Sequence, residues 1–253
     1  MLKSVLLGLV QGLTEFLPVS SSGHLVLANS VLGTSGEAAF EETAFLHLAT
    51  LLAVLFYFRK GLLALLLDFF KAGGAASRMT VLYLFIASIP AGIAGILAKD
   101  WLAGMFRANS LWISIFFLIN AALLIGSDHI KGKNAPLNGG KSFFIGILQA
   151  LAILPGISRS GSTIGAGIFC GLSREKALEF SFYMSIPAVL FGNLLLGSFS
   201  ASLFNTGMML ASAAAFLSGL AAISLLMLMV KKSRLRYFGF YTLAVALINL
   251  FLI

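Results

Sequence analysis

The sequence predicts an all-α integral membrane protein, with six transmembrane helices and two re-entrant helix hairpins in two inverted-topology repeats. Of its 253 residues, 59% are hydrophobic and only 10% are charged. Apolar runs close to the length of a membrane span, about 20 residues, recur along the whole chain. Two stretches of the sequence also repeat at one fixed spacing. A soluble globular domain is therefore excluded.

The first apolar run is too short for a span. A helix is expected over residues 2–17, and Pro18 with the following serines breaks it. A second short apolar run covers residues 25–32. Two half-length helices around a polar turn are typical of a re-entrant hairpin, which enters and leaves the membrane on the same side. Because residues 1–18 lack a small-residue cleavage site and contain Glu15, a cleavable signal peptide is not expected.

The remaining elements of the first half follow from apolar runs and charged breaks. Glu37, Glu41 and Glu42 are expected in an acidic loop. Spans are then predicted at residues 43–58, 80–97 and 111–125, with an interfacial helix at residues 61–70. The polar residues 128–141 form a linker, so repeat 1 covers about residues 1–127 and repeat 2 about residues 142–253.

The second half begins like the first. The segment Leu7–Gln11 (LGLVQ) is echoed by residues 145–149 (IGILQ), and residues 19–23 (VSSSG) by residues 157–161 (ISRSG). Both pairs are 138 residues apart (149 − 11 and 161 − 23). Spans follow at residues 178–196, 208–230 and 237–253. Because each half has three spans, an odd number, the second half must start on the opposite side, which makes the repeats inverted.

The basic residues predict the orientation. The net charge of +8 comes largely from Lys and Arg in the segments after the first, third and fifth spans. These segments fall on one side, which the positive-inside rule makes cytoplasmic. Lys99 and Arg107 fall on the other side but are outnumbered. The first hairpin then enters from the outer face and the second from the cytoplasm, and their turns meet near mid-membrane. No aromatic-basic motif suggests nucleic acid, and a single cysteine, Cys170, excludes an intrachain disulfide.

The two turns are candidates for an anion site. Each turn begins a half-helix, whose first N–H groups and partial positive charge favour an anion. Serine and glycine allow the backbone to come close, and Arg159 adds a bidentate donor suited to phosphate. For a diphosphate, Ser21 could attack phosphorus, His24 could transfer protons and Glu15 could hold a divalent cation.

At these residues the sequence resembles the undecaprenyl-diphosphate phosphatases, also called bacitracin-resistance proteins. The family's first motif, Glu or Gln separated by three residues from a second Glu, matches Gln11 and Glu15, and its PGxSRSxxT motif matches PGISRSGST at residues 155–163. The flanking LPVSSSGH at residues 17–24 also fits. The resemblance covers the whole chain.

The resemblance implies a hydrolase that removes the terminal phosphate of undecaprenyl diphosphate. Its product is the lipid carrier for peptidoglycan and other cell-wall glycans. The enzyme would lie in the bacterial cytoplasmic (inner) membrane with its site open to the outer face. The resemblance implies catalytic roles for four residues, with Ser21 or His24 as the nucleophile: Glu15, Ser21, His24 and Arg159. The substrate-binding residues expected from the two turns are Ser20, Ser22, Gly23, Gly156, Ser158, Ser160, Gly161 and Thr163.

The candidate site residues and the family resemblance also indicate a cofactor and partners. A divalent cation, Mg²⁺ or Ca²⁺, is expected at Glu15 and Gln11, although the neutral amide of Gln11 is a poorer ligand than the Glu found in many relatives. The expected partners are the isoprenoid diphosphate and membrane lipids, with a homodimer left open and no nucleic acid.

Plainer interpretations compete with these roles. Ser20 and Ser22 suit helix caps better than chemistry, His47 is expected to pack or to form a hydrogen bond, and a solvated position is expected for His129. The main alternative function is a secondary transporter or flippase for a lipid phosphate or another anion, because transporters also build sites from broken helices in inverted repeats. Clustered Glu15, Ser21 and His24 exceed what an anion carrier needs.

Overall fold

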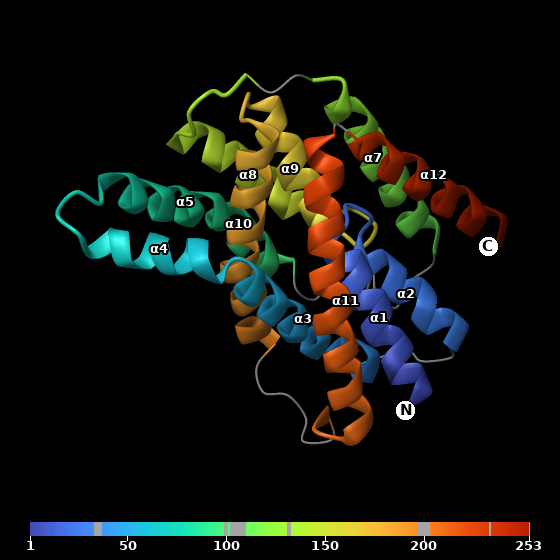
Figure 1. Cartoon of the computed structure of the whole chain (residues 1–253). Helices are drawn as coiled ribbons and strands as arrows, with labels where there is room; N and C mark the ends of the chain where they lie inside the picture. Colours follow the sequence, from blue (N-terminus) through green and yellow to red (C-terminus); the bar gives the residue numbers. More distant parts are fainter. Residues whose placement is uncertain are drawn as a thin grey trace.

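The structure, a computed structural model, describes residues 1–32, 37–98, 101, 110–130, 133–196, 203–232 and 234–252. These ranges form α-helices joined by short connections, without any β-strand (Figure 1). The helices in chain order are α1 (Leu2–Phe16), α2 (Ser21–Leu32), α3 (Glu37–Tyr57), α4 (Arg59–Phe70), α5 (Ala75–Leu97), α7 (Ser110–Asp128), α8 (Gly139–Leu151), α9 (Arg159–Phe169), α10 (Arg174–Leu196), α11 (Thr206–Lys231) and α12 (Leu235–Leu252). The prediction of an all-α protein is confirmed.

Several of these helices can cross a membrane. In the described part of the chain, α5, α7, α10 and α11 are long and apolar enough. A fifth candidate is the pair α3 and α4, which bends by 73° at the break between them. Large apolar side chains face outward on these helices, as on Phe85 of α5 and Leu217 of α11, which are 66% and 64% exposed. Exposed apolar surface on this scale suits lipid, so the chain is a multi-pass membrane protein.

The short helices lie against long ones. α1 packs along α11, α8 packs along α5, and α7 packs along α12 (Figure 1). The largest core cluster draws Phe16, Ile164, Phe182 and Leu226 from α1, α9, α10 and α11. This cluster contains residues of both halves of the chain, so the two halves share one core.

One expected element is wrong. Glu37, Glu41 and Glu42 do not form an acidic loop but belong to the first turns of α3. Alanine and glutamate are strong helix formers, and acidic residues are favoured near a helix N-terminus, where the helix dipole is positive. The helix that contains the span predicted at residues 43–58 therefore begins earlier, at Glu37. Lys99, Arg107 and Lys131, which entered the prediction of orientation, lie outside the described residues.

Candidate active site

Each hairpin turn is fixed by a serine at the start of its second helix. Ser158 is the N-cap of α9, and its Oγ accepts a hydrogen bond from the Gly161 N–H at 3.1 Å. Ser20 precedes α2 in the same way, and its Oγ accepts from the Gly23 N–H at 3.4 Å. Both helices thus begin where the sequence predicted a break. The cap interpretation is confirmed for Ser20, whereas Ser22 pairs with the Ser20 hydroxyl at 3.3 Å.

The two turns contact each other directly. The Gly156 N–H donates to Ser20 Oγ at 3.0 Å, and Ser160 Oγ donates to the Leu17 carbonyl at 3.3 Å. Gly156 has φ +112°, and a Cβ there would meet the Ile113 carbonyl at 2.8 Å, so only glycine fits. The expectation that the turns meet is confirmed.

Asn120 of α7 holds the two turns together. Its Nδ2 donates to the Pro18 carbonyl and its Oδ1 accepts from the Ser158 N–H, both at 3.0 Å. The side chain is fully buried, so these two backbone groups have no access to water. Asn120 was not among the residues predicted from the sequence. The available signal was an amide in the middle of an apolar span, where polar side chains are costly unless they are hydrogen-bonded.

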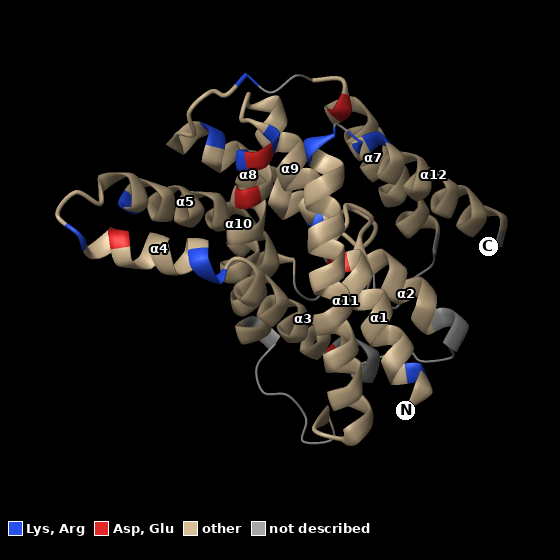
Figure 2. Cartoon of the chain, in the orientation of Figure 1, with Lys and Arg blue, Asp and Glu red and all other residues tan. Residues whose placement is uncertain are grey.

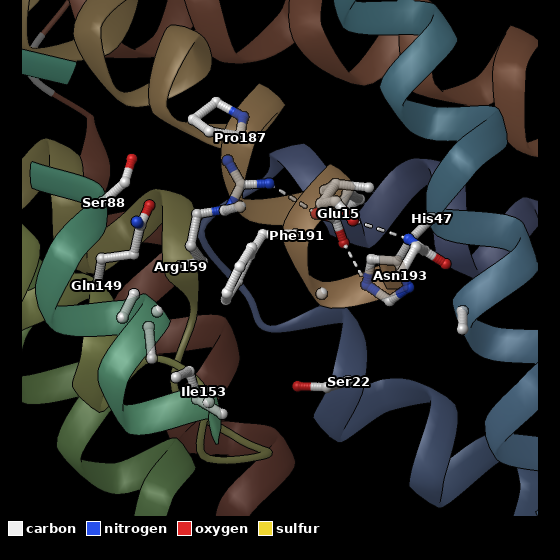
Figure 3. Close-up of a pocket in the computed structure, with 18 of the residues that line it drawn as sticks. Glu15, Ser22, His47, Ser88, Gln149, Ile153, Arg159, Pro187, Phe191 and Asn193 are labelled. Atoms are coloured by element: carbon white, nitrogen blue, oxygen red, sulfur yellow. Dashed lines mark hydrogen bonds and ion pairs between the residues drawn. The ribbon is translucent and has the colours of Figure 1, made fainter. Parts of the chain in front are cut away.

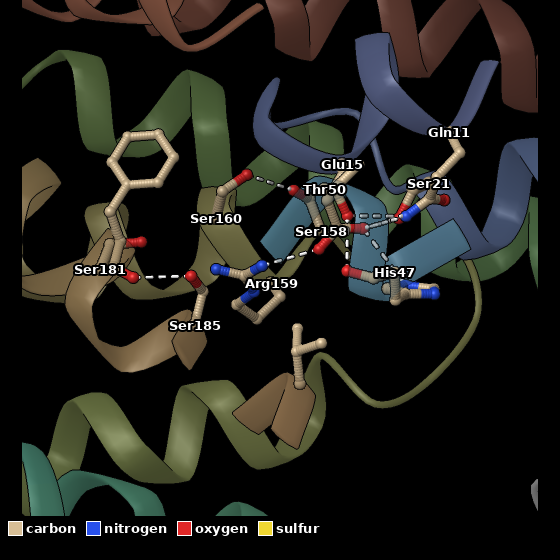
Figure 4. A network of polar contacts seen from close by, with 12 residues as sticks. Gln11, Glu15, Ser21, His47, Thr50, Ser158, Arg159, Ser160, Ser181 and Ser185 are labelled. Carbon is tan, nitrogen blue, oxygen red and sulfur yellow. Dashed lines mark hydrogen bonds and ion pairs between the residues drawn. The ribbon is translucent and has the colours of Figure 1, made fainter. Parts of the chain in front are cut away.

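Glu15 is the centre of the polar network (Figure 4). Its Oε1 lies 2.7 Å from Arg159 Nη2, and its Oε2 accepts from Ser21 Oγ at 2.6 Å and from Gln11 Nε2 at 3.2 Å. The carboxylate is almost fully buried, with 7% of its side chain exposed. The predicted catalytic residues Glu15, Ser21 and Arg159 therefore lie together.

His47 of α3 joins this network, although a site role was not expected for it. Its Nε2 lies 3.3 Å from Glu15 Oε2, and its Nδ1 lies 2.7 Å from the Thr43 carbonyl oxygen. Both neighbours are hydrogen-bond acceptors, so a proton on each ring nitrogen satisfies both contacts, and the ring is then a cation. Glu15 is thus flanked by the guanidinium of Arg159 and the imidazole of His47. Sequence spacing could not reveal this, because α3 is brought to Glu15 only by the tertiary fold.

His24 is not brought to Glu15. Its Nδ1 lies 2.8 Å from the Ser20 carbonyl oxygen and its Nε2 lies 2.9 Å from the Tyr241 hydroxyl. The ring stacks on Tyr241 of α12, with the ring centroids 5.6 Å apart. His24 therefore contacts α12 rather than the acid, the serine and the arginine with which it was grouped.

A cavity of about 860 Å³ opens beside this network (Figure 3). One end is polar and is lined by Glu15, Ser20, Ser21, Ser22, His47, Ser158 and Arg159. The walls are mostly apolar and come from α5 and α10, with Phe85, Ile89 and Phe191 among them. Arg159 Nη1 is buried and has no hydrogen-bond partner among the residues that the structure describes. The cavity can therefore take an amphiphilic ligand with an anionic end.

Five expected substrate-binding residues are absent from the cavity lining: Gly23, Gly156, Ser160, Gly161 and Thr163. The N–H groups of the three glycines donate to the hydroxyls of Ser20 and Ser158. Thr163 Oγ1 donates to the Arg159 carbonyl at 2.8 Å. Gly156 and Ser160 thus join the two turns, whereas Gly23, Gly161 and Thr163 bond within their own helices, and the cavity surface is provided by the serine side chains and Arg159.

The donors next to Glu15 fit a divalent cation. Gln11 Oε1 is buried without a hydrogen-bond partner, and it belongs to the amide that bonds Glu15. A carboxylate, an amide oxygen and a hydroxyl are ligands that Mg²⁺ and Ca²⁺ accept. No group of three or more His, Cys, Asp or Glu side chains that could hold a metal occurs among the described residues. An ion here would need further oxygens from its substrate or from water.

The apolar helices and the buried polar cluster define a multi-pass integral membrane protein with a site inside the helix bundle. The chain belongs to the family described as bacitracin resistance protein BacA, whose model matches residues 4–248.

Named relatives resemble the chain over nearly its whole length. A protein of Thermosipho africanus named undecaprenyl-diphosphatase is 39% identical over 249 residues, covering 98% of both chains. Proteins with the same name from Christiangramia forsetii and Methanococcus vannielii are 38% and 37% identical. The first of these alignments covers 96% of this chain and 95% of the relative, and the second covers both chains completely. The resemblance found in the sequence motifs is thus confirmed.

Replacing Asn120 by alanine is expected to destabilise the protein. Asn120→Ala leaves the Ser158 N–H and the Pro18 carbonyl buried without partners, which costs about 2–4 kcal/mol for the two groups. The unfolding midpoint of the purified protein in detergent should fall clearly. Ser224→Ala is the control, because Ser224 is exposed on α11 and bonds only the Leu220 carbonyl of its own helix. Equal midpoints for the two variants would contradict the role given to Asn120.

Proposed function

We propose that this chain hydrolyses the terminal phosphate of undecaprenyl diphosphate and releases undecaprenyl phosphate. The observation that carries the proposal is the Glu15, Ser21 and Arg159 cluster at the polar end of an otherwise apolar cavity. Membership of the BacA family and the name shared by the relatives support the same activity. The product is the lipid carrier of cell-wall glycan synthesis, and its regeneration accounts for resistance to bacitracin.

The cavity matches both parts of such a substrate. The diphosphate binds at the polar end, and the first isoprene units lie against the apolar walls of α5 and α10. The unpartnered Nη1 of Arg159 donates to an oxygen of the terminal phosphate, while its Nη2 stays on Glu15. The guanidinium thereby places the phosphorus next to Ser21 and stabilises the charge that builds up on the equatorial oxygens.

Ser21 is the nucleophile in this proposal. Its hydroxyl already donates to Glu15, the arrangement of a nucleophile beside a general base. Attack forms the bond from Oγ to phosphorus and breaks the bond to the bridging oxygen, the hydroxyl proton moves to Glu15, and the lipid monophosphate leaves. Water then attacks the phosphoserine and Glu15 returns its proton to Oγ. One proton of the water stays on the inorganic phosphate and the other passes to solvent.

The two histidines have different parts. His47, 3.3 Å from Glu15, keeps the buried acid ionised together with Arg159, so that it can accept the serine proton. His24 is the alternative nucleophile, but its ring nitrogens contact the Ser20 carbonyl and Tyr241, which supports Ser21 instead. The contact with Tyr241 gives His24 the role of holding the turn on α12.

A divalent cation, Mg²⁺ or Ca²⁺, also belongs to the proposal. Glu15 and the unpartnered Gln11 Oε1 would hold it, and it would neutralise part of the charge on the diphosphate.

For the membrane arrangement we propose six spans, α3, α5, α7, α10, α11 and α12, and two re-entrant hairpins, α1–α2 and α8–α9. Equivalent contacts support the two repeats. Gly8 of α1 packs on the Ala211 backbone of α11, and Gly146, its counterpart 138 residues later, packs on the Ala87 backbone of α5. The repeats are about residues 1–127 and 142–253.

The charges support an orientation. In Figure 2 most basic residues gather around the α4–α5 pair and at the end of the bundle where α8 and α12 begin and α11 ends. The proposal places both groups of basic residues on the cytoplasmic side of the membrane, as the positive-inside rule expects. The proposed location is the cytoplasmic membrane, with the site open to the outer face.

Removing the guanidinium of Arg159 tests the proposed function. Purified wild-type protein in detergent should release inorganic phosphate from a long-chain isoprenoid diphosphate. Arg159→Ala should lower kcat/KM by about 10³-fold, because a donor to the transferred phosphoryl group is worth several kcal/mol. The control is Arg59→Ala, since Arg59 lies at the start of α4 and donates only to the Phe56 carbonyl. Movement of lipid in vesicles without phosphate release, or full activity of Arg159→Ala, would contradict the proposal.

The cation is tested by its removal. EDTA should lower phosphate release, and added Mg²⁺ or Ca²⁺ should restore it, because the substrate's charge is then neutralised again. A Gln11→Glu variant should need less cation for half-maximal activity, since a second carboxylate binds it more tightly. Undiminished release in EDTA would argue against a cation at this site.

A further inference from the structure

Gln149 of α8 is buried in the cavity wall, and its side-chain amide bonds no group in the described part of the chain. Only 2% of its surface is exposed, yet neither Nε2 nor Oε1 has a hydrogen-bond partner. It lines the same cavity as Glu15 and Arg159. Burying an amide without hydrogen-bond partners costs free energy. A bound ligand that bonds the amide would remove this cost.

The repeat explains why Gln149 has no partner. Its counterpart in the first half, Gln11, donates to Glu15, four residues further along α1. Four residues after Gln149 stands Ile153, which has no polar atom in its side chain. The second half therefore has the amide but no acid at the position that would bond it. What remains is an amide with a free donor and a free acceptor inside the cavity.

Gln149 and the acid lie on opposite sides of Arg159 in the view of the cavity (Figure 3). In the view of Figure 3, Gln149 and Ser88 are on one side of Arg159, and Glu15 and His47 are on the other. Ser88 Oγ donates to the Leu84 carbonyl, so it cannot supply a proton to Gln149. A diphosphate whose terminal phosphate lies between Arg159 and Ser21 can extend its second phosphate toward Gln149.

We propose that Gln149 binds the phosphate that stays on the lipid, with Nε2 donating to one of its oxygens. This inference rests on the proposed function. In the diphosphate this inner phosphate carries one negative charge, whereas the terminal phosphate carries up to two. A neutral amide donor suits the less charged group, and the cation Arg159 suits the more charged one. Oε1 accepts from water or from a protonated phosphate oxygen.

The test compares Gln149→Leu with wild type, because leucine is similar in size but forms no hydrogen bond. The KM for an isoprenoid diphosphate should rise about 10-fold, since a hydrogen bond to a charged group is lost. Inhibition by the matching isoprenyl monophosphate should weaken by a similar factor, and inhibition by inorganic phosphate should stay unchanged. The unfolding midpoint in detergent should not fall, because the variant removes an unpartnered polar group.

Ser212→Ala is the matched control. Ser212 Oγ is also buried without a partner, but Ser212 is not part of the cavity lining. This variant should keep the wild-type KM and both inhibition constants.

Three results would overturn the inference. The first is an unchanged KM and monophosphate inhibition in Gln149→Leu. The second is an equal loss of inhibition by inorganic phosphate, which would place Gln149 at the terminal phosphate. The third is a lowered unfolding midpoint with wild-type kinetics, as expected if Gln149 only holds structural water. Absence of phosphate release by the wild type would instead overturn the proposed function itself.

Discussion

The ion pair between Glu15 and Arg159 is the interaction on which the site depends. The two residues are 144 positions apart in the chain, and their charged atoms are 2.7 Å apart in the fold. A charge inside an apolar helix bundle is costly unless an opposite charge is close, so each residue needs the other. The remaining contacts of the turns serve this pairing: Asn120 and Ser20 hold the hairpins together, and Ser158 and Ser20 begin the helices on which Arg159 and Ser21 stand.

The two halves of the chain have the same hairpin but supply different chemistry. The first provides the acid Glu15 and the hydroxyl of Ser21, and the second provides Arg159 at the position equivalent to Ser21. A second acid at Ile153 would face the same cavity as Glu15 and add a negative charge where a diphosphate is to bind. With isoleucine there, the site has one acid next to Arg159 and His47, an arrangement in which a buried carboxylate can stay ionised.

The sequence predicted what local patterns determine. Composition and spacing predict the helix breaks at Pro18 and Pro155 and the recurrence of similar segments 138 residues apart. The chemistry of phosphate predicts that Glu15, Ser21 and Arg159 act together. Contacts set by tertiary packing were not predictable in this way. His47 and Asn120 lie on helices that reach the turns only in the folded bundle, and His24 points to α12 although it is close to Ser21 in sequence. The acidic segment at Glu37, expected as a loop, is helical because alanine and glutamate favour a helix.

A double-mutant cycle on phosphate release tests most directly whether Glu15 and Arg159 act as one unit. Glu15→Gln, Arg159→Gln and the double variant would be compared with wild type by kcat/KM on a long-chain isoprenoid diphosphate. When two residues act as a unit, the losses of kcat/KM from the single variants do not add up. The kcat/KM of the double variant should therefore be no lower than that of the less active single variant. Losses that multiply would contradict the central place given to this ion pair.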